Sequence, residues 1–230
     1  MIKIYNNDCM EYLQSQNCID DFRGKNVILV TDPPFNIGYH YNEYKDKLAD
    51  EEYYSLLESI CDSYNYKGLV FIHYPESLYK LSFQIGLFPE KVVSWVYNSN
   101  TSKQHRDIAF FKVKPIFKQV LQPYKNPTDK RIAARIAKGI GGGKLYDWWN
   151  INQVKNVSKK ENSHPCVMPL KVMENIVGIL PKENLLVFDP FMGSGTTGIA
   201  CRKHNIDFVG CEINNEYYEI AKQRIKELKQ

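Results

Sequence analysis

Short apolar runs alternate along the chain with longer stretches that mix apolar and polar residues. Residues 27–30, 69–72 and 185–188 are apolar at successive positions, which is typical of strands buried on both faces, so strands are expected at Val27–Thr31, Leu69–His73 and Leu185–Phe188. Residues 2–5 alternate instead. Three further runs complete the set of expected strands: Val92–Tyr97, Ile108–Val113 and Phe208–Cys211.

The stretches between these runs predict helices. Asp8 is placed to cap a helix that starts near Met10, and three acids at 50–52 lie at the positive end of the next helix, which runs to about Ser63. The other expected helices cover Pro75–Ile85, Leu170–Leu180, Thr196–His204 and Asn215–Leu228. Strands that alternate with helices predict an α/β fold with a doubly wound, mostly parallel sheet.

The strand at Val27–Thr31 stops abruptly at Asp32-Pro33-Pro34-Phe35. Two prolines fix φ and remove two backbone donors, so the chain after Asp32 is stiff and its carbonyls have no local partner. A carboxylate, outward carbonyls and a flat aromatic face within four residues suit a planar group that carries an NH2. The same sequence also ends strands for purely structural reasons. We call residues 32–35 the clamp. The next stretch, Asn36–Lys47, is rich in Tyr, Asn and Gly, and we interpret it as a mobile loop over the clamp.

A second buried strand leads into Asp189-Pro190-Phe191-Met192-Gly193-Ser194-Gly195-Thr196-Thr197. A strand, a Gly-x-Gly turn, a helix and a further strand that ends in Glu212 indicate a nucleotide-binding βαβ unit. The glycines allow the backbone to approach a ligand, and Thr196 and Thr197 are placed to cap the helix. Glu212 is placed to hold a ribose diol. No Lys follows the second glycine, so this is not a Walker loop.

Residues 101–160 differ from the rest of the chain in charge. They hold 14 lysines and arginines against three acids, whereas the formal net charge of the whole chain is +4, so the remainder is acidic. Residues 131–138 predict a helix with its cations on one face, followed by a glycine-rich link at 139–143 that we expect to be flexible. Trp149 is expected in the core. The segment favours a polyanion partner, with a solvated surface as the alternative, and the candidate contacts are Lys118, Lys125, Lys130, Arg131, Arg135 and Lys138.

Composition bears on the cellular location of the protein and on metal binding. No apolar run approaches the roughly 18 residues that a membrane span needs, and the first four residues do not resemble a signal peptide. The six cysteines show no CxxC pair. We therefore expect a cytoplasmic protein with reduced cysteines and no metal site.

The segments TDPPF (31–35) and FDPFMGSGTT (188–197), in that order, resemble the β group of S-adenosylmethionine-dependent DNA amino-methyltransferases. In that family the catalytic motif precedes the cofactor motif because the fold is circularly permuted. The likeness covers almost the whole chain. It implies a catalytic half (1–113), a basic target-recognition insertion (114–160) and a cofactor-binding half (161–230).

The resemblance also implies which residues bind S-adenosyl-L-methionine. Asn7-Asp8-Cys9 resembles the family's acidic motif near the cofactor adenine, and His164-Pro165 with Pro169 resembles its HPxxxP segment. The expected cofactor-binding residues are Asp8, Cys9, Asp32, His164, Pro165, Asp189, Pro190, Phe191, Gly193, Ser194, Gly195, Thr196, Thr197 and Glu212.

The same resemblance makes Asp32, Pro33, Pro34 and Phe35 the expected catalytic residues, acting on a base flipped out of double-stranded DNA. Asp at position 32 favours adenine N6 by the family pattern. Many adenine-modifying members read HPTQKP where this chain reads HPCVMP, with Met168 in place of the lysine, so cytosine N4 is an open alternative. RNA, a protein amide, and binding without catalysis are further alternatives. A homodimer and a cognate restriction endonuclease are compatible with the resemblance.

Overall fold

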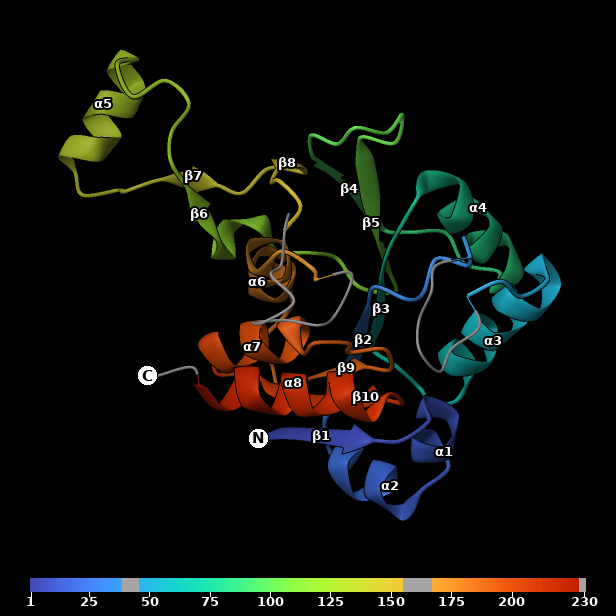
Figure 1. Cartoon of the computed structure of the whole chain (residues 1–230). Helices are drawn as coiled ribbons and strands as arrows, with labels where there is room; N and C mark the ends of the chain where they lie inside the picture. Colours follow the sequence, from blue (N-terminus) through green and yellow to red (C-terminus); the bar gives the residue numbers. More distant parts are fainter. Residues whose placement is uncertain (39–45, 155–166, 228–230) are drawn as a thin grey trace.

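The computed structural model of the chain describes residues 1–38, 46–154 and 167–227. Its centre is an eight-stranded sheet with the strand order β1-β10-β9-β2-β3-β5-β4-β8 (Figure 1). None of the helices in the described ranges is long and apolar enough to cross a membrane. The strands of the sheet are β1 (Ile2–Asn6), β2 (Asn26–Thr31), β3 (Gly68–His73), β4 (Lys91–Val96), β5 (His105–Phe111), β8 (Trp148–Asn150), β9 (Leu185–Asp189) and β10 (Asp207–Glu212).

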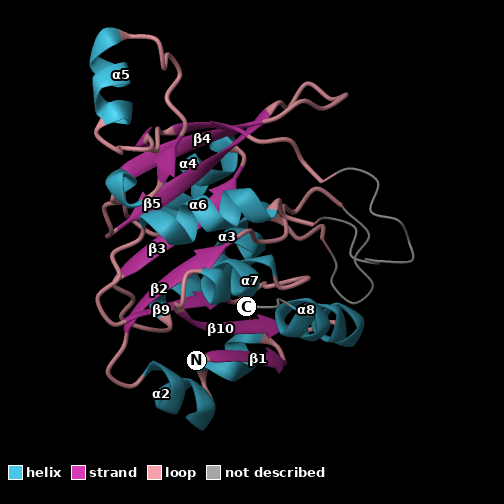
Figure 2. Ribbon diagram, turned by 90° about the vertical axis from the view of Figure 1, so that its left-hand side faces the viewer, coloured by secondary structure: helices cyan, strands magenta, loops and turns pink. Residues whose placement is uncertain are grey.

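Helices cover both faces of the sheet (Figures 1 and 2). Along β2, Val27 and Leu29 pack into one hydrophobic core with α1–α4, whereas Ile28 and Val30 pack into the other with α6–α8. The predicted α/β fold is therefore confirmed. The helices are α1 (Cys9–Leu13), α2 (Gln16–Phe22), α3 (Asp50–Asp62), α4 (Pro75–Gln84), α5 (Lys130–Ala137), α6 (Leu170–Ile179), α7 (Thr196–Lys203) and α8 (Asn215–Glu227).

Strand β5 runs antiparallel to both of its neighbours, β3 and β4, whereas the other pairs in this sheet are parallel. The alternation of strands and helices does not predict this reversal. It occurs because β4 and β5 are joined by a hairpin at 97–104 instead of a helix. As a result the amino end of β5 lies at the edge where β3 ends, with Asp107 opposite His73.

The basic segment is divided between the sheet and a projecting part. Its β8 pairs with β4 and buries Trp149, as predicted. The short strands β6 (Leu121–Gln122) and β7 (Gly143–Lys144) pair with each other after a turn of 3-10 helix, η1 (Phe117–Gln119), and α5 stands away from the sheet with no buried residue (Figures 1 and 2). The flexibility of the glycine link stays a prediction; at Gly142 a Cβ would lie 2.7 Å from the carbonyl oxygen of Gln122. Glycine there permits close packing.

Candidate functional site

A cavity of about 410 Å³ opens at the edge of the sheet where the parallel strands end. It lies beside the junction of β9 and β2, at which the strand order reverses, and open α/β sheets bind ligands at such switch points. Most of the expected catalytic and cofactor-binding residues line it together. These residues are Asp8, Cys9, Asp32, Pro33, Pro34, Phe35, Asp189, Pro190, Phe191, Gly193, Ser194, Thr196, Thr197 and Glu212.

Two groups of expected cofactor residues are not in that lining. His164 and Pro165 lie outside the described residues. Gly195 faces away from the cavity lining, because a Cβ on it would lie 2.9 Å from the Cβ of Ala221 in α8. Its φ of +78° also favours glycine. Gly195 therefore shapes the turn and lets α8 approach.

Asp32 follows the last residue of β2 and has an asymmetric environment. Its Oδ2 lies 3.8 Å from Nη1 of Arg106, whereas its buried Oδ1 accepts no hydrogen bond from any described residue. Burial raises the pKa of Asp32 to about 7; Arg106 opposes this shift and the Asp189 carboxylate adds to it. The open oxygen points to a ligand that donates a hydrogen bond.

Side chains of α3 and of the end of β3 contact the rest of the clamp. The hydroxyl of Tyr53 in α3 donates to the Pro34 carbonyl at 2.7 Å and lies 3.0 Å from Nε2 of His73. Burial lowers the pKa of His73 to about 3, so its ring is neutral. The Phe35 ring centre lies 4.6 Å from that of His73 and 5.2 Å from that of Tyr74. These contacts from α3 and the end of β3 fix the position of the Phe35 ring.

Arg106 is a site residue that the sequence analysis missed. Its Cζ lies 4.3 Å from the ring centre of Phe35, and the side chain is 13% exposed at the cavity. The predicted strand began only at Ile108, and the amino end of a strand is not expected beside the carboxyl ends of its neighbours. The one available signal was a basic residue directly before an apolar run, at the end of a hairpin.

Asp189, in contrast to Asp32, has partners for both oxygens. Its Oδ1 accepts hydrogen bonds from the hydroxyl of Thr31 at 3.0 Å and the backbone N–H of Phe191 at 3.2 Å, and its Oδ2 accepts one from the hydroxyl of Thr197 at 2.6 Å. The expectation that Thr196 and Thr197 cap α7 is wrong. The N-cap is Gly195, and no side chain caps the helix.

The glycine turn is held by backbone and side-chain contacts. The backbone N–H of Gly193 donates to Oε2 of Glu212 at 3.0 Å, and that of Asn214 donates to Oε1 at 2.9 Å. Nη1 of Arg224, in α8, donates to the carbonyl oxygen and to Oγ of Ser194, both at 2.6 Å. Together these bonds fix the turn against β10 and α8.

Gly198 completes a Gly-x-Gly-x-x-Gly spacing with Gly193 and Gly195 of this turn. A Cβ there would lie 2.8 Å from side-chain atoms of both Phe208 and Ile225. The third glycine therefore serves close packing of α7 against β10 and α8.

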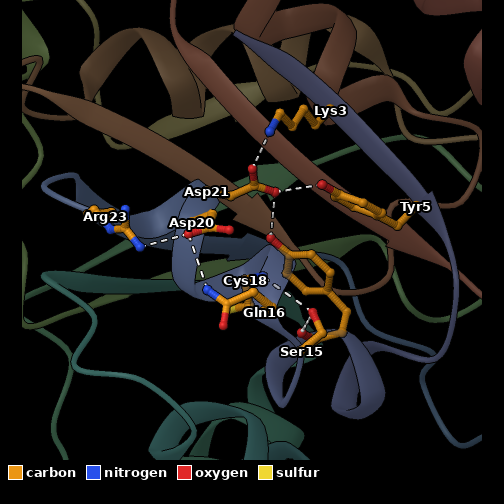
Figure 3. Close-up of polar contacts among 9 residues, drawn as sticks. Lys3, Tyr5, Ser15, Gln16, Cys18, Asp20, Asp21 and Arg23 are labelled. Carbon is orange, nitrogen blue, oxygen red and sulfur yellow. Dashed lines mark hydrogen bonds and ion pairs between the residues drawn. The ribbon is translucent and has the colours of Figure 1, made fainter.

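Asp8 caps α1, as predicted, by accepting hydrogen bonds from two backbone N–H groups of the first turn at 2.8 and 3.2 Å. Cys9 next to it is 5% exposed. The buried carboxylate of Asp21 in α2 fixes this corner to β1, because it accepts hydrogen bonds from the side chains of Lys3 and Tyr5 (Figure 3). The helix pair thus holds the Asp8 motif at the cavity.

The predicted loop after the clamp is closed at its base. The Asn36 side chain donates to the carbonyl oxygen of Leu48 at 3.0 Å and accepts from its N–H at 2.6 Å. Asp46 accepts a hydrogen bond from the backbone of Asn36 at 2.8 Å. All three tyrosines of this stretch, Tyr39, Tyr41 and Tyr44, lie outside the described residues.

The six candidate polyanion contacts are absent from the cavity lining. Most lie on or near α5, whose cap Asp129 accepts from two backbone N–H groups at 3.0 and 3.3 Å. Nζ of Lys125 lies 5.0 Å from the ring centre of Tyr146 and 5.7 Å from that of Trp148. The described part of the chain contains no cluster of three His, Cys, Asp or Glu side chains that could hold a metal ion.

Comparison with known proteins identifies the family. A family model described as DNA methylase, for N6 and N4 modification, matches residues 27–223. The chain is 28% identical to the type II methyltransferase M.HpaI of Haemophilus parainfluenzae over 86% of this chain and 67% of that protein. It is also 28% identical to M.BglII of Bacillus subtilis, over 96% of this chain and 68% of that protein.

Solved structures share the fold. The M1.HpyAVI–SAM complex has a TM-score of 0.61 at 22% identity, covering 97% of this chain and 100% of that one. The cytosine-N4-specific PvuII DNA methyltransferase has a TM-score of 0.68 at 17% identity, covering 100% and 87%. The chain belongs to the S-adenosylmethionine-dependent DNA amino-methyltransferases, as the two motifs indicated.

Proposed function

We propose that this DNA methylase transfers the methyl group of S-adenosylmethionine to N6 of an adenine flipped out of double-stranded DNA at a specific sequence. One observation carries the proposal. Oδ1 of Asp32 is buried in the cavity lining and accepts no hydrogen bond from the described residues. A buried acceptor of this kind is costly unless a ligand satisfies it, and an exocyclic amine supplies the matching N–H.

The cavity fits the cofactor. S-adenosylmethionine, when bound, supplies an electrophilic methyl group on a sulfonium. Glu212, whose two oxygens each accept a backbone N–H, would also accept hydrogen bonds from the ribose hydroxyls, because a carboxylate oxygen can accept more than one hydrogen bond. The turn at Gly193 allows close approach of the backbone, while Asp8 and Phe191 would border the adenine ring.

The clamp would orient the amine for attack. An exocyclic amine is a poor nucleophile because its lone pair is delocalised into the base. Asp32 and the Pro33 carbonyl would accept its two N–H bonds and direct the lone pair at the methyl, while Phe35 stacks on the base. The new N–C bond would form as the S–C bond breaks, with S-adenosylhomocysteine as the leaving group, and the alkylated nitrogen, now acidic, would pass its proton to Asp32 or to water. Orientation of this kind can contribute roughly 7–11 kcal/mol.

The basic segment would hold the DNA backbone. Residues 101–160 hold 14 lysines and arginines against three acids, and every residue of α5 is at least partly exposed. Cations on an exposed helix beside half-exposed aromatics suit phosphate contacts. We propose the six candidates as DNA contacts: Lys118, Lys125, Lys130, Arg131, Arg135 and Lys138.

The choice of adenine rests on Asp32, and cytosine N4 is the rival. The family includes both activities, and the structural neighbours include a cytosine-N4-specific enzyme, so the fold does not separate them. Met168, where many adenine-modifying members carry lysine, lines the cavity and weakens the case for adenine. The naming of several relatives as type II methyltransferases supports a cognate endonuclease as partner. A homodimer is a separate proposal, to be tested by light scattering.

The test is methyl transfer from labelled S-adenosylmethionine to unmethylated DNA, followed by mass spectrometry of the nucleosides. We expect N6-methyladenine. N4-methylcytosine would keep the clamp and the cofactor site but overturn the assignment of the base. No label in DNA, with the cofactor bound, would move the substrate to RNA or protein.

A further inference from the structure

Arg106 contacts both functional parts of the clamp, yet the transfer chemistry proposed above does not use it. Its guanidinium lies over the ring of Phe35 and beside Oδ2 of Asp32, at 4.3 and 3.8 Å. We propose that Arg106 is a positioning residue, which directs Oδ1 of Asp32 at the target amine and favours the carboxylate form of Asp32. This inference rests on the proposed function.

The guanidinium makes the two oxygens of Asp32 different. Oδ2 faces Arg106, whereas Oδ1 accepts no hydrogen bond from the described residues and is available to a ligand. The Arg106 charge favours the orientation of the carboxylate in which Oδ2 faces the guanidinium and Oδ1 faces the cavity. The amine therefore meets an acceptor whose direction is set before it binds.

Arg106 is itself restrained. The ring centres of Trp95, Tyr74 and Tyr97 lie 5.4, 5.8 and 5.9 Å from its Cζ. A planar guanidinium stacks on such rings, and a lysine ammonium in its place would keep the charge without the plane. Since β5 is antiparallel, its first residues bring this side chain to the edge where Asp32 lies.

The charges around Asp32 make Arg106 decisive for its ionisation. Burial and the Asp189 carboxylate of β9 both raise the pKa of Asp32, and the cation that opposes them is Arg106 of β5. Two other titratable side chains lie on neighbouring strands. His73 at the end of β3 is neutral, and burial raises the pKa of Tyr97, which follows β4, so neither side chain supplies a charge. With Arg106 present the pKa is about 7. Without it, the pKa would rise further, and a protonated Asp32 would lose acceptor capacity at neutral pH.

The experiment compares Arg106→Met, Arg106→Lys and, as the matched control, Lys103→Met. Lys103 is a neighbouring cation whose Nζ lies 3.8 Å from the ring centre of Tyr74. Single-turnover methyl transfer to DNA is measured from pH 5.5 to 9.5, and cofactor binding by calorimetry reports on folding. For Arg106→Met we expect the acid limb of the rate profile to move up by about one unit or more. The loss of methyl-transfer rate in Arg106→Met, relative to the wild type, is then on the order of tenfold larger at pH 6 than at pH 9.

Arg106→Lys should return the acid limb towards that of the wild type while keeping a lower maximal rate, and Lys103→Met should leave the limb in place. An unshifted limb in Arg106→Met, with the rate reduced equally at every pH, would show that Arg106 only packs against Phe35 and would overturn the proposal.

A second readout separates this inference from the proposed function. The carbon-13 shift of the Asp32 carboxyl is titrated in the cofactor-bound wild type and in Arg106→Met and Arg106→Lys. If the wild type transfers no methyl to DNA, the proposed function fails; an Asp32 pKa that rises in Arg106→Met would then still support the positioning role, and an unchanged pKa would overturn it.

Discussion

Asp32 and Asp189 occupy equivalent places on neighbouring strands, yet their surroundings differ. Each follows or ends a buried apolar strand and precedes a proline, β2 pairs with β9, and burial raises the pKa of both carboxyls, to about 7 and about 6. Asp189 accepts three hydrogen bonds that join β2, β9 and α7, whereas Asp32 keeps an oxygen open to the cavity. The same residue in the same local sequence is a structural junction in one strand and, in the role we propose, a ligand acceptor in the next, and long-range partners make the difference.

The largest expected effect is on catalysis, from Asp32→Ala. Removing the amine acceptor should lower the single-turnover rate of methyl transfer on the order of 10³-fold. Cofactor affinity, measured by calorimetry, should change little, because the proposed ribose acceptor Glu212 and the glycine turn are intact. An equal loss of transfer and cofactor affinity would contradict the role assigned to Asp32.

The next effect is on stability, from Asp189→Ala. The hydroxyls of Thr31 and Thr197 would lose their acceptor in a buried environment, so the free energy of unfolding should fall by about 2–4 kcal/mol. Urea unfolding measures it. Asp32→Ala serves as the control, since Oδ1 of Asp32 accepts no hydrogen bond from the described residues. If Asp32→Ala were the more destabilising, the distinction between junction and acceptor would fail.

A smaller effect, of opposite sign, concerns pH. The pKa of Asp32 is raised from 3.8 to about 7 in the folded protein, so its ionisation destabilises the fold. That cost is fully present above pH 7, shrinks as the pH falls, and is absent below the unfolded pKa. Asp32→Asn should therefore be more stable than the wild type at pH 8, and this gain should vanish near pH 4. Urea unfolding at both values tests it; a gain that is the same at both would refute the raised pKa.

The smallest effect on the site itself should come from α5, remote from both carboxylates. Changing Arg131 and Arg135 together to Gln should weaken DNA binding and flatten its salt dependence by about two units of slope, because each arginine would neutralise one phosphate. Fluorescence anisotropy across a salt series measures this. Lys222→Gln, on the exposed surface of α8, is the matched control. An unchanged slope would return α5 to the solvated-surface interpretation.

Features that depend on residues close together in the sequence could be predicted, whereas features that depend on contacts between distant residues could not. Continuous apolar runs predicted β2 and β9, and the residues directly after them proved to share one cavity, because strand ends in a parallel sheet meet at one edge. The antiparallel β5 broke that rule, so Arg106 was missed. Thr197 was assigned to a helix cap because capping is local, whereas its actual partner, Asp189, competes for it within the folded core.

The glycine turn also has a consequence for the last helix of the chain. Arg224 bonds to Ser194, and Gly195 lets Ala221 come into contact with the turn, so α8 is packed directly onto the loop that lines the cavity. Opening of α8 and loss of the loop's shape are then one cooperative event. A ligand held by that loop would slow amide exchange in α8, and C-terminal tags or truncations that loosen this helix would be felt first as weaker cofactor binding.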